Sequence, residues 1–296
     1  MSASIPNKTP DRLWLCMEDS PRMRTLSRAL ANGMGVTVYL GPTVDPDGPI
    51  AVMVADDTNI ARLATAKAHA APNQKSILVT GSQQRSVQAD LYLAHDCDAG
   101  TLANVIEALF AFRAFQLSDV ATQANPVSGT LESANFRVRT LDEAARIAIF
   151  LGAMAPQVCE ATVGLYVLLA GAIEHGNLQF SLEEKAQGLA SGNWDRRMAQ
   201  RMAEQAYLSR RVSVEFHRGE RLISLLIQDD GDGIDAGTAE LANPLRGGHR
   251  GQGIKLAKSL GFAELTWLGV GNTLAASIVL PTVEGEILRR QGATVS

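Results

Sequence analysis

The stretch IQDDGDGID, residues 227–235, decides how the second half of this sequence folds. It ends an apolar run, Leu222–Gln228, that we expect to be a buried strand, and Gly231 and Gly233 then let the chain turn tightly. The carboxylate of Asp229, at the strand end, can accept hydrogen bonds from a flat ligand that the backbone approaches closely. Adenine, with its exocyclic amine, is one such ligand, whereas an acidic surface turn explains the same residues without any ligand.

A calcium-binding loop is another interpretation of this acidic stretch. Glu240 is the twelfth residue counted from Asp229, where an EF-hand loop carries its bidentate carboxylate. The stretch begins in a predicted strand, however, and lacks the helix that precedes such a loop. We therefore do not favour a calcium loop, and a ligand-binding turn and an acidic surface turn both remain open for this stretch.

Two glycine-rich segments follow. RGGHRGQG, residues 246–253, precedes a predicted helix, Gly253–Leu260, whose first N–H groups and dipole would favour a phosphate. GVGNT, residues 269–273, lies between two apolar runs, Ala263–Trp267 and Thr273–Val279, and predicts a hairpin turn. Taken singly, the first segment is equally explained as a flexible connection, and the second shows only that two strands meet.

The residues before these motifs have a helical pattern. Thr140 and Glu143 form a capping-box pair that begins one helix, and a second helix is predicted from Gln157 to Gly176. A strand at Val212–Phe216 comes later. Helices first and antiparallel strands afterwards predict an α+β sandwich rather than a second parallel sheet.

These motifs together resemble a known superfamily. In order, DxGxG at 229–233, GxG at 251–253 and GNT at 271–273 resemble the G1, G2 and G3 boxes of the GHKL ATPases, which include histidine kinases and gyrase. GLYVLLAGAIEHGN, residues 164–177, resembles their N box in the form typical of anti-sigma serine kinases and of ATP-binding domains fused to response regulators. The resemblance covers about half of the chain. It implies a Bergerat-type sandwich at 135–282, followed by a tail at 283–296.

The resemblance also implies a ligand, ATP or ADP, and the residues that would bind it. Asp229 would recognise adenine, and the loop between Asp235 and Gly251 would be the ATP lid. The residues implied in nucleotide binding are Glu174, His175, Asn177, Asp229, Gly231, Gly233, Gly251, Gly253 and Thr273.

One departure from the family pattern bears on catalysis. Active members carry in the N box a Glu that activates the attacking group and, four residues later, an Asn that ligates Mg²⁺; here these positions are Val167 and Gly171. Neither side chain can act as a base or hold a metal. We therefore expect no catalytic residue here, weakened Mg²⁺ binding, and weak or absent hydrolysis. A protein that binds no nucleotide at all is the remaining alternative.

The N-terminal part, residues 11–116, alternates short apolar runs with helical patterns, which predicts a parallel sheet in a flavodoxin-like α/β domain. Residues 117–134, rich in Ser, Thr, Asn and Gln, are predicted to be a linker. The expected strands are Leu13–Met17, Val36–Leu40, Ile50–Ala55, Ser76–Thr80 and Ala89–Leu93, and the expected helices are Pro21–Ala31, Thr58–His69 and Thr101–Phe115.

This part resembles the receiver domain of response regulators. Glu18, Asp19 and Asp56 follow predicted strands, as do the acidic residues that hold Mg²⁺ in receivers, and the resemblance implies Asp56 as the phosphoacceptor. His95 stands where receivers carry a Lys, and no Met-Pro follows Asp56, which makes this receiver degenerate. Carboxylates that only cap strands and begin helices are the alternative.

Composition restricts the cellular location and the classes of binding partner that are expected. The chain has 296 residues, 46% of them hydrophobic, and a net charge of -4, which gives no reason to expect nucleic acid or an anionic membrane as partner. Cys16, Cys97 and Cys159 have no disulfide or zinc spacing. No signal peptide and no uninterrupted apolar run of about 20 residues is seen, so a cytoplasmic protein is expected.

The expected partner is a protein: a sigma factor, an anti-sigma antagonist or a phosphorelay protein. A homodimer through the helix in Thr101–Gln123 is a further expectation, because such a helix would leave an apolar stripe to bury. The basic segment Asn193–Arg211 is interpreted as a solvated helix face. An active anti-sigma-type Ser/Thr kinase is the alternative function. A histidine phosphotransferase ranks last, because no His occurs between Asp98 and Glu174.

Overall fold

The chain divides into two compact units. The structure is a computed structural model and describes residues 12–33, 36–42, 50–70, 73–81, 89–116, 131–233 and 252–281. Unit 1 consists of residues 1–116 and 181–200, and unit 2 of residues 117–180 and 201–296. The segment 181–200 therefore groups with unit 1, although it lies inside the range 135–282 that the sequence predicted as one domain.

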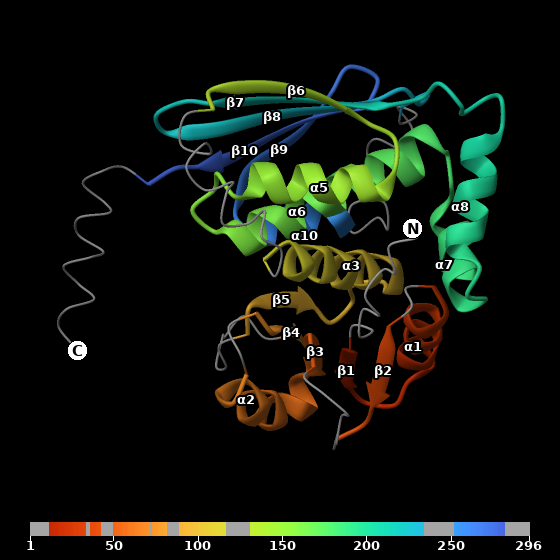
Figure 1. The fold of residues 1–296 in the computed structure, drawn as a ribbon, viewed down its shortest axis with the longest axis vertical. Helices are drawn as coiled ribbons and strands as arrows, with labels where there is room; N and C mark the ends of the chain where they lie inside the picture. Colours follow the sequence, from red (N-terminus) through yellow and green to blue (C-terminus); the bar gives the residue numbers. More distant parts are fainter. Residues whose placement is uncertain are drawn as a thin grey trace, which may run out of the picture. The chain divides into compact units, whose positions relative to one another are not determined.

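Unit 1 is an α/β fold around a parallel sheet, as the sequence predicted (Figure 1). The five strands pair in the order β2-β1-β3-β4-β5, one of the common orders of doubly wound sheets, whose ligand crevice lies at the carboxyl ends of the strands. The elements are β1 Arg12–Cys16, α1 Pro21–Gly33, β2 Thr37–Leu40, β3 Val52–Asp56, the 3₁₀ turn η1 Asp57–Asn59, α2 Ile60–Ala68, β4 Lys75–Thr80, β5 Leu91–Ala94 and α3 Ala99–Gln116.

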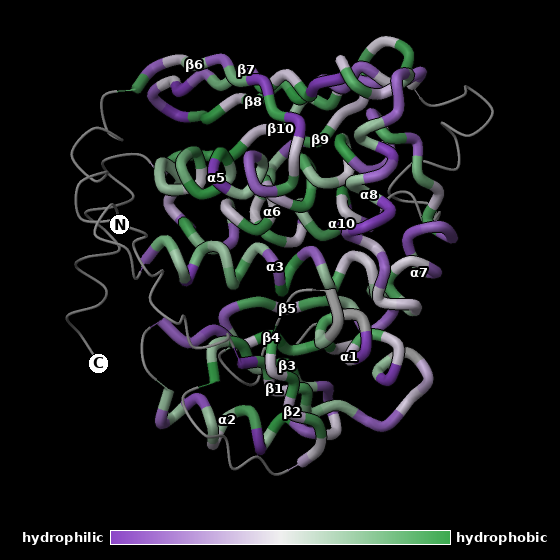
Figure 2. The backbone as a smooth tube through the Cα atoms, turned by 45° about the vertical axis from the view of Figure 1, so that its right-hand side comes forward, coloured by the Kyte–Doolittle hydropathy of each residue, from purple (hydrophilic) through white to green (hydrophobic). Residues whose placement is uncertain are grey.

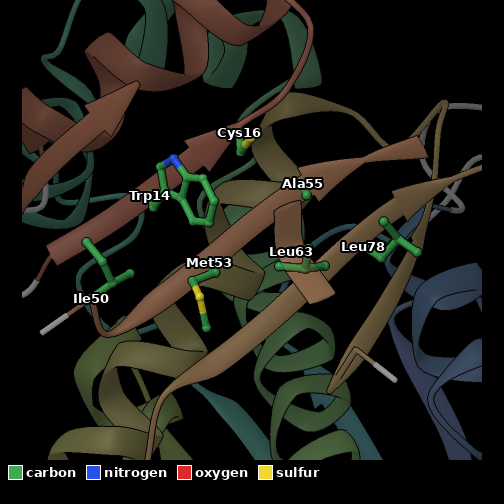
Figure 3. Packing of buried hydrophobic residues seen from close by; sticks show 7 residues of the cluster. All are labelled: Trp14, Cys16, Ile50, Met53, Ala55, Leu63 and Leu78. Carbon is green, nitrogen blue, oxygen red and sulfur yellow. The ribbon is translucent and has the colours of Figure 1, made fainter. Parts of the chain in front are cut away.

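The three central strands β1, β3 and β4 are buried almost throughout because helices cover both faces, and they carry mostly the hydrophobic colour in Figure 2. On the face under α2, Leu63 packs into a cluster with Trp14, Met53 and Leu78 (Figure 3). Helix α3 is buried almost all round, and Gln116 is its only exposed residue. The homodimer expected through Thr101–Gln123 stays a prediction, because residues 117–123 lie outside the described residues.

Residues 181–200, which belong to unit 1, contain helix α7 Leu182–Ala190 and the first part of helix α8 Trp194–Ala203. These two helices were not predicted as separate elements from the sequence. Helix α7 packs on α1 and α3. Lys185 Nζ donates to Asn104 Oδ1 at 3.0 Å, and both residues are buried. Gly100 makes room for this contact, because a Cβ there would lie 3.1 Å from Lys185 Cε.

Unit 2 is an antiparallel sheet covered by helices on one face, so the predicted α+β arrangement is found (Figure 1). The strands pair in the order β6-β7-β8-β10-β9, and α6 packs against both α5 and α10. The elements are β6 Ser133–Val138, α5 Leu141–Gly152, α6 Val158–Gly171, the π-helical turn η2 Ala172–Asn177, β7 Val212–Arg218, β8 Leu222–Asp229, α10 Gln252–Ser259, β9 Phe262–Leu268 and β10 Thr273–Val279.

Strand β6 was missed, and its first residues fall in the range predicted as linker. It is an edge strand that pairs only with β7 among the described strands, and Val138 is its only buried residue. An edge strand with so little burial has a weak apolar alternation. The capping box at Thr140 and Glu143 is confirmed at the start of α5.

Helix α6 offers a matched test of this packing. We expect Gly164→Ala to lower the free energy of unfolding by about 1–3 kcal/mol, because its Cβ would lie 2.5 Å from the ring of the buried Phe262. Gly171→Ala is the control, because its Cβ meets no described atom within 4 Å. There alanine should stabilise the helix by up to about 1 kcal/mol. Urea unfolding measures both, and equal effects would contradict the α6–β9 packing.

Candidate functional site

Asp229, the last residue of β8, is held through its backbone by the turn between β9 and β10. Its N–H donates to the Asn272 carbonyl oxygen at 2.9 Å, and its carbonyl oxygen accepts from Asn272 Nδ2 at 3.1 Å. Thr273 lies opposite Gln228 in the pairing of β8 with β10. The hairpin turn predicted at 269–273 therefore lies directly beside Asp229.

Glycines let other segments come up against the Asp229 carboxylate. A Cβ on Gly176 would lie 2.4 Å from Asp229 Cγ, and a Cβ on Gly231 would lie 2.7 Å from Asp229 Oδ1. Gly233 has a φ of +81°, a region that favours glycine, and its Cβ would lie 2.4 Å from the Val270 carbonyl oxygen. The segments around residues 176 and 231 thus meet at the Asp229 carboxylate, and the segment around residue 270 lies against the same turn at Gly233.

The π-helical turn at the end of α6 carries three of the predicted site residues. In it the Leu178 N–H donates to the Ile173 carbonyl oxygen, the i to i−5 bond of a π turn, a feature frequent at functional sites. Asn177 is buried, and its Oδ1 accepts from the Asp230 N–H at 2.7 Å. Asn177 Nδ2 is buried and has no acceptor among the described residues, so a donor remains next to the Asp229 turn.

Glu174 and His175 hold the chain that leaves this turn. Glu174 is completely buried, and its main-chain carbonyl oxygen accepts from the Phe180 N–H at 2.9 Å. His175 Nδ1 lies 2.7 Å from the Phe180 carbonyl oxygen, a contact in which the ring nitrogen donates. Both residues thus lie in the turn next to Asp229 and also stabilise the end of the helix.

Gly171 and Val167 lie about one and two turns further back along the helix from His175. Val167 is buried, and a Cβ on Gly253 would lie 3.1 Å from its Cγ1, so the start of α10 contacts α6 at this point. A Cβ on Gly171 would meet no atom of the described residues within 4 Å. Gly251 and the predicted lid between Asp235 and Gly251 lie outside the described residues.

Two arginines of the basic segment support the π turn, so its interpretation as a solvated face is wrong for them. Arg201 Nη1 donates to the Leu178 carbonyl oxygen at 2.9 Å, and its guanidinium lies 4.2 Å from the centre of the Phe180 ring. Arg210 Nη1 donates to the Asn177 carbonyl oxygen, also at 2.9 Å. Carbonyl groups at a helix end need such donors, but periodicity in the sequence does not reveal which arginines supply them.

Burial raises the pKa of Asp229 from 3.8 to about 6. The hydrogen bond from the Gly231 N–H and the positive charge of Arg210 oppose this rise, whereas the neighbouring Asp230 adds to it. An ionised Asp229 is therefore costly in the ligand-free protein. A ligand that donates a hydrogen bond to it would offset part of that cost.

In unit 1, Asp56 acts as the N-cap of η1. Its Oδ1 accepts from the Thr58 hydroxyl, from the Asn59 N–H and from Asn59 Nδ2, and its Oδ2 accepts from the Glu18 N–H. Burial alone would raise the pKa of Asp56, but these hydrogen bonds outweigh it and hold the pKa below 3.8. The Asp56 oxygens are therefore already engaged within the protein.

Glu18, Asp19 and Asp57, which follow the carboxyl ends of β1 and β3, are brought together with Asp56 only in part. The Glu18 contact with Asp56 is made by the backbone N–H, and the Asp19 carboxylate pairs with Arg24 at 3.1 Å. Asp57 accepts from the Gly81 N–H at 3.0 Å. Within the described ranges no three His, Cys, Asp or Glu side chains are grouped so that they could hold a metal.

One helical stretch among the described residues, Val158–Asn177, is long and apolar enough to cross a membrane by length and composition. Its most apolar window is 67% buried inside the protein. Such burial is typical of the core helix of a soluble protein.

No protein-family model and no curated protein sequence matches this chain, so its function has to be inferred from the geometry of its own residues. That geometry favours a ligand that offers a hydrogen-bond donor to a buried carboxylate.

The pKa of Asp229 predicts a pH-dependent stability. Because the folded pKa lies above the unfolded value, this group destabilises the fold increasingly as the pH rises through about 6. Asp229→Asn removes the charge and retains an acceptor for the Gly231 N–H. It should therefore raise the melting temperature more at pH 8 than at pH 5, because the cost builds up between the unfolded value of 3.8 and the folded value of about 6 and is complete only above both. Asp230→Asn is the control, because that carboxylate belongs to an exposed residue; an equal gain at both pH values for Asp229→Asn would contradict the burial argument.

Proposed function

We propose that unit 2 is a nucleotide-binding module of the GHKL type with a Bergerat-type sandwich, and that it binds ATP or ADP. The observation that carries the proposal is the buried Asp229 carboxylate, pressed between Gly176 and Gly231 where the N-box-like, G1-like and G3-like segments meet. Because the backbone of Asp229 is fixed by Asn272, the carboxylate is preorganised for one donor. The exocyclic amine of adenine supplies such a donor.

The module would bind nucleotide without efficient hydrolysis and act as a pseudokinase. Val167 is a buried apolar side chain in contact with the start of α10, and Gly171 offers no ligand for a metal. Phosphoryl transfer needs both an oriented nucleophile and a metal that neutralises the phosphates. Mg²⁺ would then be held by the nucleotide rather than by the chain.

Unit 1 would be a degenerate receiver that regulates unit 2, with signalling through protein partners. Its strand order is the one found in flavodoxin-like domains, and the Asp56 carboxylate already accepts hydrogen bonds from three residues. Phosphorylation of Asp56 would have to break the hydrogen bonds with which this residue caps η1. The partners proposed are a sigma factor, an anti-sigma antagonist or a phosphorelay protein in the cytoplasm. An active anti-sigma-type Ser/Thr kinase, using ATP and Mg²⁺, is the second candidate, favoured by the AIEHGN sequence at 172–177.

Titration of the full chain with a fluorescent ATP analogue, with and without Mg²⁺, tests the binding proposal. We expect micromolar binding that changes little with Mg²⁺. Asp229→Asn should weaken it by roughly tenfold or more, because an amide that keeps its oxygen on the Gly231 N–H presents a donor to the adenine amine. Asp230→Asn, one residue away, should bind like the wild type. Equal binding by the wild type and both variants would contradict the proposal that adenine binds at the Asp229 turn.

The pseudokinase proposal is tested by restoring the two missing groups. We expect Val167→Glu with Gly171→Asn to make nucleotide binding Mg²⁺-dependent and to give measurable ATP hydrolysis. A Cβ at position 171 meets no described atom within 4 Å, whereas Val167→Glu places a carboxyl at a buried position. Gly171→Asn alone is therefore the control for Mg²⁺ dependence without hydrolysis. Hydrolysis by the wild type at the rate of the double variant would favour the active kinase instead.

A further inference from the structure

The Arg210 guanidinium joins two segments of the site that are distant in sequence. Its Nη1 donates to the Asn177 carbonyl oxygen at 2.9 Å, and its Nη2 lies 3.7 Å from Asp232 Oδ1. The guanidinium also lies 5.1 Å from the centre of the Tyr207 ring, which limits how it can move. One side chain therefore holds the end of the π turn and the turn after β8 together.

The register of these two segments decides where the Asp229 carboxylate lies. Gly176 touches that carboxylate, and the next residue, Asn177, binds the N–H of the next residue of the turn, Asp230. Gln179 Nε2 adds a further bond to Asp232 Oδ2 at 2.5 Å. A shift of the π turn would move Gly176 away from Asp229, and Arg210 contacts the turn at its last residue.

The charges around Asp229 give Arg210 a second effect. Ionisable groups lie in the π turn (Glu174, His175), in the turn of Asp229 itself (Asp230, Asp232) and in the segment before β7 (Arg210, Arg211). Arg210 is a cation whose charge lowers the pKa of Asp229. The Arg210 side chain is only 19% exposed, so solvent screens this charge less than it would a surface charge.

We propose that Arg210 is a positioning residue for Asp229, holding the end of the π turn against the 229–233 turn so that the carboxylate stays placed for a purine amine. The identity of the ligand rests on the proposed function. The positioning itself is a property of the ligand-free protein.

Arg201 provides a matched control on the same turn. It donates to the next carbonyl oxygen, that of Leu178, and lies 5.6 Å from the centre of the same Tyr207 ring. Its carboxylate partner, however, is Glu204 at 3.6 Å, which lies in its own segment. Arg201→Gln thus removes a similar carbonyl contact, and neither this contact nor the ion pair with Glu204 reaches the 229–233 turn.

The experiment follows the Asp229 carboxyl by NMR in the ligand-free full chain labelled with ¹³C-aspartate, the signal being assigned by its loss in Asp229→Asn. We expect Arg210→Gln to raise the Asp229 titration midpoint above its wild-type value and Arg201→Gln to leave it unchanged. Arg210→Lys should restore the midpoint but not the forked contact. Affinity for the ATP analogue at pH 7 should fall roughly tenfold in Arg210→Gln and stay near wild type in Arg201→Gln.

A second readout keeps the test decisive if Arg210→Gln fails to fold. Hydrogen exchange of the Asp230 N–H, which donates to Asn177, should be faster in Arg210→Lys and unchanged in Arg201→Lys. Equal effects of the Arg210 and Arg201 variants on this exchange and on the Asp229 titration would overturn the proposal. A wild type that binds no ATP analogue, while the Asp229 titration still responds to Arg210, would instead refute the proposed ligand and leave the positioning role intact.

Discussion

The buried carboxylate of Asp229 is the constraint on which the rest of unit 2 depends. Its backbone is fixed by Asn272, and its side chain touches the main chain at Gly176 and Gly231, where a larger residue has no room. Desolvation makes the charge costly, and only part of the cost is offset by the Gly231 N–H and Arg210. Stability alone would favour a neutral residue at this position, and the retained carboxylate therefore supports the proposed ligand.

The end of helix α6 is shaped by the same constraint. Helix α6 is apolar and its core-facing residues are buried, so water does not satisfy the carbonyl groups at its end. Arg201 and Arg210 donate hydrogen bonds to the Leu178 and Asn177 carbonyl oxygens instead. The π turn then brings Gly176 and Asn177 to the strand end. The same contacts therefore stabilise the helix end and place the site, and they account for two of the basic residues before β7.

Unit 1 uses its acidic edge differently. The Asp56 carboxylate accepts from the Glu18 and Asn59 N–H groups, and the Asp57 carboxylate accepts from the Gly81 N–H. Hydrogen bonds within unit 1 therefore stabilise the carboxyl edge of the parallel sheet. These hydrogen bonds occupy the Asp56 carboxylate, which agrees with the proposal that unit 1 is a degenerate receiver. The buried Lys185–Asn104 bond shows that unit 1 also takes part of its core from residues 181–200.

The sequence by itself determined the α/β class of unit 1, the α+β order of unit 2 and most strand and helix positions, because apolar periodicity and capping residues act locally. It also singled out Asp229, Gly231 and Thr273, since strand-end carboxylates and glycine turns are local signals. Only the tertiary structure decided that Gly176 lies against Asp229, that Arg201 and Arg210 close the π turn, and that residues 181–200 belong to unit 1. These features depend on contacts between residues that are far apart in sequence. Edge strand β6 has only one buried residue and therefore a weak apolar pattern, so it is recognised only from its pairing with β7.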